Sequence, residues 1–162
     1  MHDASKVLMV LRPAGSTKPI GPHKWVADTG PSFDIVPVRE CSNDLLSEKV
    51  RLKTSVDMQT VNGPLIVDEG LRIAVPTLEK ELDFLLLPNS PPIISVGKRC
   101  MIDGYEFHWP RGQPPYMVTP EDKRIDLVVD NFVPFISSEP GLHTRARMSG
   151  PKRTSAFPGG AV

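Results

Sequence analysis

Short apolar runs separated by turn residues dominate this chain, and this pattern predicts strands rather than long helices. An apolar run over 24–27 leads directly into Asp28, and a second short run covers 33–38. Within the second run, Phe33 and Asp34 fall on opposite sides of the alternation. The sequence therefore predicts two strands joined by a loop that begins at Asp28.

A β-hairpin is predicted over the next part of the chain. Hydrophobic and threonine side chains alternate with polar ones from 52 to 61, and Asn62-Gly63 follows at once. Asn-Gly favours a tight two-residue turn, because both residues tolerate positive φ. Residues 64–76 then provide the returning strand.

The middle of the chain predicts a buried strand over 81–87, which ends in three leucines, and a very short apolar run at Ile93-Ile94. The one short helix that we expect runs from Ser95, which can act as its N-cap, to about Asp103. Gly104 follows where such a helix ends. Residues 42–48 predict only a helical turn.

The composition favours an all-β fold. The chain has 18 prolines in 162 residues, about twice the usual share of ~5%, and helices tolerate internal proline poorly. We expect one domain over 23–136, preceded by a partly flexible lead-in over 1–22. Residues 137–162 are polar, rich in Gly and Pro and mildly basic, and predict a disordered tail.

Charge and cysteine content exclude several classes of function. The chain has 19 basic and 19 acidic side chains, so its net charge predicts neither a nucleic-acid nor a membrane partner. Its two cysteines and four histidines lack metal-ligand spacing, and we expect no metal and no cofactor. No apolar run approaches the ~20 residues of a membrane span, and the sparse cysteines suit a reducing, cytoplasmic compartment.

The stretch Asp28-Thr29-Gly30 is the strongest candidate for chemistry. A tripeptide of this kind also forms ordinary Asx turns. Hydrolysis of a peptide bond by aspartates requires two carboxylates that share one proton and activate a water molecule. The chain offers one Asp-Thr-Gly, so a catalytic Asp28 requires a second copy of the chain. The chemistry therefore predicts a symmetric homodimer with Asp28 at the two-fold axis.

The neighbouring residues have predicted roles in the same site. Thr29 is expected to brace the two carboxylates through its hydroxyl, and Gly30 to shape the cleft. The hairpin tip is expected to fold over an extended peptide as a flap. The residues that we expect to line the flap and cleft are Ser32, Val61, Asn62, Gly63, Ile93, Ile94 and Ser95.

Several ordered motifs together resemble a known family. Trp25 to Gly30, Thr60 to Gly63, the segment Leu85 to Cys100 and Asp103 to Phe107 resemble the protease region of Copia-type retrotransposon polyproteins, within the retropepsin family. The resemblance covers roughly 23–136. It implies a single-lobe, closed acid-protease fold that dimerises, an aspartate–water mechanism, and a peptide or polyprotein substrate encoded by the element. It also implies a location within element-encoded particles.

One departure from the family pattern leaves an alternative open. Pro31 follows Gly30, where the family usually has a small residue. Proline has no N–H and a fixed φ, which could weaken substrate contacts beside Asp28. The alternative is a catalytically impaired domain of the same fold that binds peptides or forms dimers.

Overall fold

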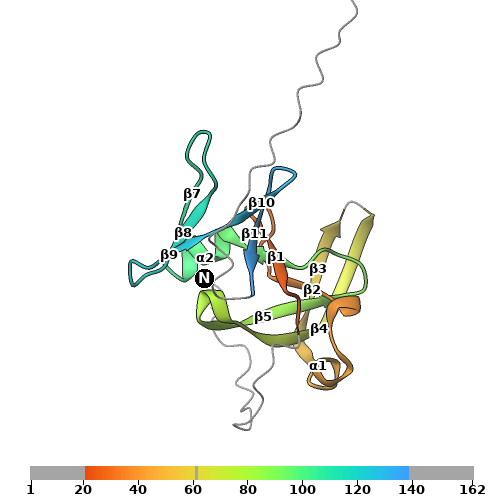
Figure 1. Cartoon of the computed structure of the whole chain (residues 1–162). Coiled ribbons are helices and arrows are strands. Elements are labelled where there is room, and N and C mark those ends of the chain that lie inside the picture. The colour runs from red at the N-terminus through yellow and green to blue at the C-terminus, as the bar shows by residue number, and fades with distance from the viewer. Residues whose placement is uncertain (1–20, 61, 139–162) are drawn as a thin grey trace, which may run out of the picture.

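The computed structural model describes residues 21–60 and 62–138, which form two β-sheets and two short α-helices. The larger sheet has eight strands in the order β10-β11-β1-β6-β2-β5-β4-β3, and the smaller has three in the order β7-β8-β9 (Figure 1). The strands are β1 (Lys24–Asp28), β2 (Ile35–Pro37), β3 (Val50–Thr60), β4 (Gly63–Val75), β5 (Lys80–Leu87), β6 (Ile93–Ser95), β7 (Glu106–His108), β8 (Tyr116–Val118), β9 (Arg124–Asp126), β10 (Val128–Asp130) and β11 (Val133–Ser137). This mostly β architecture confirms the predicted class.

Two details of the predicted fold are wrong. The hydrogen-bonded order of the larger sheet ends at β3 on one side and at β10 on the other, so the described strands do not close it into a barrel. The described chain also has two α-helices instead of one, α1 (Asn43–Ser47) and α2 (Val96–Ile102). Ser42 accepts a hydrogen bond from the amide of Leu45 and so completes α1 as a capped helix.

The centre of the larger sheet brings distant parts of the chain together. Strand β6 lies between β1, to which it is parallel, and β2, to which it is antiparallel. On its other side β1 pairs with β11, so that Lys24 lies opposite Ser137. Side chains alternate between the two faces of a strand, and β1 therefore presents Trp25 and Ala27 to one face and Val26 and Asp28 to the other.

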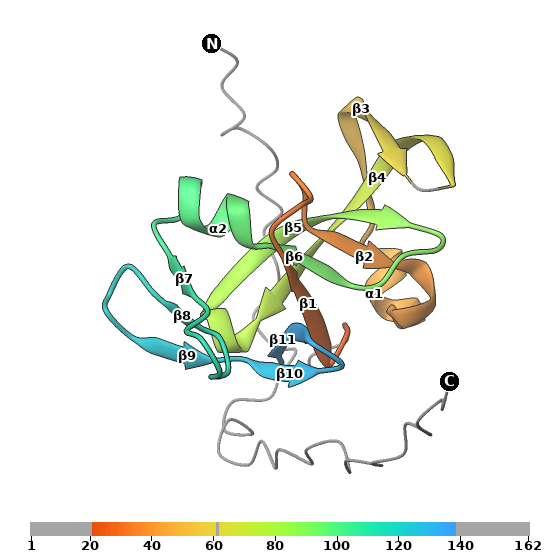
Figure 2. The same cartoon turned by 90° about the horizontal axis from the view of Figure 1, so that it is seen from above.

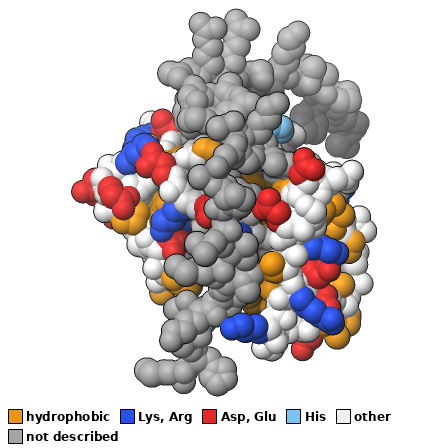
Figure 3. Space-filling view, turned by 90° about the horizontal axis from the view of Figure 1, so that it is seen from below, with side chains coloured by type: hydrophobic (Ala, Val, Ile, Leu, Met, Phe, Trp, Pro, Cys, Tyr) orange, Lys and Arg blue, Asp and Glu red, His pale blue; other side chains and the backbone are white. Residues whose placement is uncertain are grey.

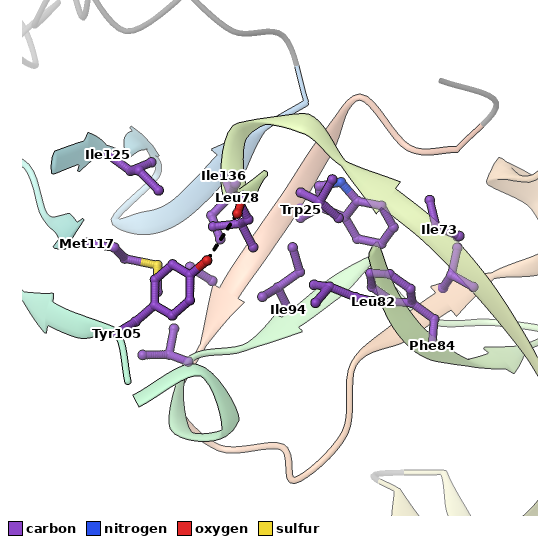
Figure 4. Packing of buried hydrophobic residues seen from close by; sticks show 14 of the residues in the cluster. Trp25, Ile73, Leu78, Leu82, Phe84, Ile94, Tyr105, Met117, Ile125 and Ile136 are labelled. Atoms are coloured by element: carbon purple, nitrogen blue, oxygen red, sulfur yellow. Dashed lines mark hydrogen bonds between the residues drawn. The ribbon is translucent and has the colours of Figure 1, made fainter. Parts of the chain in front are cut away.

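The main hydrophobic core covers the face that carries Trp25 (Figure 4). The Trp25 ring is 1% exposed and stacks on Phe84 of β5 with ring centroids 4.5 Å apart. Tyr105 reaches into the same core and donates a hydrogen bond from its hydroxyl to the carbonyl of Leu78. The smaller sheet contributes Met117 and Ile125, so both sheets share one core.

A second hydrophobic cluster occupies the opposite face. Its buried members are Ile35, Val67, Leu85 and Leu87. Its other members, from β3, β4 and β6, are only partly buried: Leu52, Val56, Met58, Leu65 and Ile93. We call this set of nine side chains the open cluster. The main core is covered by the smaller sheet, whereas the open cluster keeps more than half of its members at the surface.

The predicted hairpin is present as β3 and β4, and it projects from the rest of the molecule (Figures 1 and 2). Its turn differs from the prediction, because Thr60 pairs with Gly63 and Gly63 is already the first residue of β4. The Thr60 hydroxyl donates to the Gly63 carbonyl and accepts from the Asn62 amide, which fixes this register. Among the described residues of this turn, Gly63 has positive φ, at +112°.

The hairpin that joins β10 and β11 has an unusual tip. Asn131 and Phe132 both have positive φ, at +47° and +66°. Asparagine tolerates this region, whereas a bulky side chain rarely adopts it. The Phe132 side chain is also 91% exposed. The tip therefore places a large apolar residue in a strained backbone conformation without packing it.

The domain boundaries can be compared with the prediction at both ends. Strand β11 runs through Ser137, and Ser138 is buried, with its amide bonded to the His23 carbonyl. The ordered chain thus extends two residues beyond the predicted limit at 136. Residues 1–20 of the predicted lead-in and residues 139–162 of the predicted tail lie outside the described residues.

Over the part of the surface that is coloured in Figure 3, basic and acidic side chains are interspersed. None of the described helices is long and apolar enough to cross a membrane.

Candidate functional site

Asp28 is the last residue of β1 and lies opposite Ser95, the last residue of β6. The chain then crosses over this end of β6 to enter β2 on the other side. Asp28 is partly exposed, and Thr29 and Gly30 are exposed. We call residues 29–33 the Asp28 loop. The sheet topology thus places the predicted catalytic carboxylate at the end of a central strand, and the loop that follows it contacts the start of α2.

The predicted Asp28-Thr29-Gly30 turn is held by the carboxylate itself. Asp28 Oδ1 accepts a hydrogen bond of 2.8 Å from the amide of Gly30. A Cβ at position 30 would lie 3.3 Å from the same oxygen, so a side chain there would press on the carboxylate. This is the geometry of an Asx turn. Gly30 therefore leaves room for the carboxylate to accept the backbone donor.

Thr29 leaves its hydroxyl free within the described chain. The side chain is exposed, and no described residue accepts or donates a hydrogen bond to it. Its role as a brace that bonds to a second copy stays a prediction.

A buried ionic cluster lies directly behind the Asp28 loop. Asp34 is 0% exposed, and its Oδ2 accepts from Arg99 Nη2 at 2.9 Å and from Lys98 Nζ at 3.1 Å. Arg99 Nε lies 3.1 Å from Asp103 Oδ2, close enough for an ion pair but too poorly aligned for a hydrogen bond. Two carboxylates and two cations thus balance in charge within a largely buried space.

Ser95 connects this cluster to the Asp28 loop. Its amide donates to Asp34 Oδ1 at 2.8 Å, and its hydroxyl donates to the carbonyl of Pro31 at 2.6 Å. The same hydroxyl oxygen accepts from the amide of Lys98 at 3.1 Å, as an N-cap does. One fully buried side chain therefore joins the loop, the helix and, through its backbone, the ionic cluster.

The residues predicted to line the cleft divide into different groups. Ser32 and Asn62 are exposed, and Ile93 is partly buried in the open cluster. Ile94 is 0% exposed in the main core, on the face opposite Asp28, and Ser95 is bonded within the protein. Alternation buries Ile94 and capping buries Ser95 in this single chain, and their contact with substrate stays a prediction.

The structure does not bring the hairpin tip onto the carboxylate. In both views the tip stands apart from the end of β1 (Figures 1 and 2). The tip that joins β3 and β4 is thus not drawn beside the end of β1 in this single chain, and Val61 lies outside the described residues.

Asp34 and Arg99 are the functional residues that the sequence reasoning missed. The alternation of 33–38 placed Asp34 and Phe33 on opposite faces, but it did not indicate that Asp34 would be the buried one. The structure has Asp34 fully buried and Phe33 37% exposed. One signal in the sequence could have indicated an ion pair at this place. Arg99 and Asp103 are four residues apart on a predicted helix, a spacing at which opposite charges pair.

The two cysteines are free thiols rather than reactive groups. Burial, and to a lesser extent the charge of Glu40, raises the pKa of Cys41 to about 11. Burial also raises the pKa of Cys100. Thiolate is the nucleophilic form, so neither residue suits covalent catalysis. Across residues 21–60 and 62–138, no cluster of three or more His, Cys, Asp or Glu side chains is arranged to hold a metal ion.

Comparison of the chain with protein-family models finds no match, and no curated protein is significantly similar to it.

Proposed function

We propose that this protein is an aspartic endopeptidase of the retropepsin type, which hydrolyses peptide bonds as a homodimer. Each copy contributes Asp28, and the pair shares one proton and activates a water molecule. The proposal includes the retrotransposon-type polyprotein substrate that the sequence resemblance implies.

The single observation that carries the proposal is the face that Asp28 shares with the open cluster. Asp28 and Val26 point to one face of β1, and Val26 pairs with Ile93 of the open cluster. Ile93 in turn pairs with Ile35, another member. A partly exposed carboxylate therefore lies at the margin of a partly exposed apolar surface. This arrangement suits an extended peptide with apolar side chains next to the bond that is cleaved.

The second carboxylate has to come from another copy. Asp34 is the acidic residue nearest in sequence to Asp28. Both of its oxygens are already engaged, Oδ1 by the Ser95 amide and Oδ2 by the two cations. A carboxylate held this way is fully buried and has no free oxygen for a water molecule. This supports a site completed by the partner's Asp28.

The projecting hairpin supports a role in gripping the substrate. Strand β3 is at an edge of the larger sheet, so its outer backbone groups are available to pair with an extended peptide. The inner face of the hairpin carries Met58 and Leu65 of the open cluster. Closure of the hairpin over a bound peptide would bring these side chains and the backbone edge to the substrate together.

The test measures cleavage of a peptide mixture of known sequence by mass spectrometry at mildly acidic pH. Asp28→Asn is expected to lower the rate by about 10²–10⁴-fold or more, the usual contribution of a general acid–base group. The matched control is Asp122→Asn, an exposed turn residue with positive φ that asparagine also tolerates. Equal rates for Asp28→Asn and the parent would refute the proposal.

Mixing experiments test the dimer separately. Excess Asp28→Asn protein is expected to inhibit the parent, because mixed dimers contain one of the two carboxylates. Excess Asp122→Asn protein is expected to leave the activity of the mixture undiminished. A parent that binds peptides and self-associates without cleaving them would instead favour the catalytically impaired alternative, for which Pro31 is the motivating residue.

A further inference from the structure

We infer that Ser95 is a positioning residue for Asp28, holding the loop that directly follows the carboxylate against the start of α2. The inference rests on the proposed function for its catalytic consequence, but its structural part can be tested without any hydrolysis.

The first step of the argument is the number of bonds that Ser95 makes from a buried position. The residue is 0% exposed, and its hydroxyl both donates to Pro31 and accepts from Lys98. An N-cap requires only the second of these bonds. The bond to the Pro31 carbonyl, at 2.6 Å, is additional and fastens the middle of the Asp28 loop.

The second step is the scarcity of other constraints on that loop. Thr29, Ser32 and Phe33 are exposed, and the backbone amide of Gly30 donates to the carboxylate of Asp28 itself. Pro31 has no amide hydrogen, so its carbonyl is its one strong backbone hydrogen-bonding group. Loss of the Ser95 hydroxyl would therefore leave the loop attached chiefly at its two ends.

The third step is the rigidity of the anchor. The Ser95 amide is bonded to Asp34, which is itself held by Lys98 and Arg99. Because this anchor is formed by the backbone of Ser95, it remains when the hydroxyl alone is removed. Removal of the hydroxyl alone is therefore expected to affect the position of the Asp28 loop while the ionic cluster stays intact.

The experiment compares Ser95→Ala with Ser42→Ala. Ser42 is the N-cap of α1 and accepts from the Leu45 amide, but it makes no bond to the Asp28 loop. Both variants remove one helix cap, and only Ser95→Ala also removes the bond to Pro31. Ser95→Gly is the second variant, in case the alanine variant does not fold.

Two readouts distinguish positioning from general weakening. In Ser95→Ala the exchange rate of the Gly30 amide is expected to rise about fivefold, as for loss of one hydrogen bond, and its NMR shift to move. For any hydrolysed peptide, kcat is expected to fall about fivefold to tenfold with KM within about twofold. Ser42→Ala is expected to change neither.

The outcomes separate the two proposals. If the Gly30 amide responds no more to Ser95→Ala than to Ser42→Ala, the positioning role is wrong, whether or not the parent hydrolyses peptides. If the parent hydrolyses nothing but the Gly30 amide responds as expected, the proposed function fails while the role of Ser95 in holding the loop is supported. An unchanged kcat in an active Ser95→Ala protein would also overturn the inference.

Discussion

Replacing Asp34 by asparagine tests whether the buried ionic cluster holds the fold around the Asp28 loop. Asparagine keeps an oxygen for the Ser95 amide but offers an NH2 group, or at best a neutral oxygen, to the two cations. Arg99, with a side chain 3% exposed, and Lys98, 29% exposed, would lose their shared carboxylate. The change therefore leaves one positive charge of the cluster without a carboxylate partner in a largely buried site.

The expected cost follows from the burial of the cluster. Removal of one partner from a buried ion pair typically costs about 3–5 kcal/mol, because the remaining charge stays desolvated. The stability of a domain of this size is about 5–15 kcal/mol. With a urea m-value of about 2 kcal/mol/M, the unfolding midpoint of Asp34→Asn is expected to fall by about 2 M.

Asp83→Asn provides the matched control. Asp83 accepts two hydrogen bonds from Arg72, at 2.7 and 2.9 Å, but its side chain is 46% exposed. An exposed pair is worth about 0–1 kcal/mol. Both substitutions remove the acid from an arginine pair, so they differ mainly in burial.

The assay is urea unfolding followed by the fluorescence of buried Trp25 and by circular dichroism in parallel. Coincident transitions with unchanged m-values are required for the comparison. If the free energies of unfolding of Asp34→Asn and Asp83→Asn differ by less than about 1 kcal/mol, burial does not determine how much this cluster stabilises the fold. The reasoning about the anchor of Ser95 would then fail with it.

Two further predictions concern the turn at the tip of β10–β11 and the partly buried thiol of Cys41. Phe132→Gly is expected to raise the free energy of unfolding by about 0.5–1 kcal/mol, since glycine adopts positive φ without strain. Asn131→Gly is the control. A Phe132→Gly protein that is less stable than the parent would contradict this reasoning. For Cys41 the pKa is raised to about 11 in the folded state, above the ~8.5 of a free thiol, so its contribution to stability is complete below about pH 8.5 and declines as the pH rises towards 11. The parent is therefore expected to lose more stability than Cys41→Ala between neutral and alkaline pH, and parallel losses in urea unfolding would refute this.

The sequence predicted the strands around Asp28 well, because their signals are local. Alternation identified the hairpin strands, and the apolar run before Asp28 identified β1. The cap at Ser95 was also correct, since capping depends on neighbouring residues. Local patterns of this kind depend little on the rest of the fold.

The buried cluster was not predictable in the same way. Asp34 is neutralised by residues 64 and 65 positions away, and alternation alone cannot reveal such a partner. Ile94 was expected in the cleft together with Ile93, although adjacent residues of a strand face opposite sides. The turn at Gly63 shifted by one residue because the Thr60 hydroxyl closes it, a bond that the Asn-Gly rule does not include.

The pairing of β1 with β11 determines when, during synthesis, β1 can be paired on both of its sides. Lys24 pairs with Ser137, and the Trp25 ring nitrogen donates to Ser138, 113 residues later. Until that late segment has left the ribosome, β1 is an open edge and its tryptophan nitrogen has no partner. A nascent chain therefore holds an unfinished site, and a peptidase built this way would begin to cut only after its own domain had been fully made.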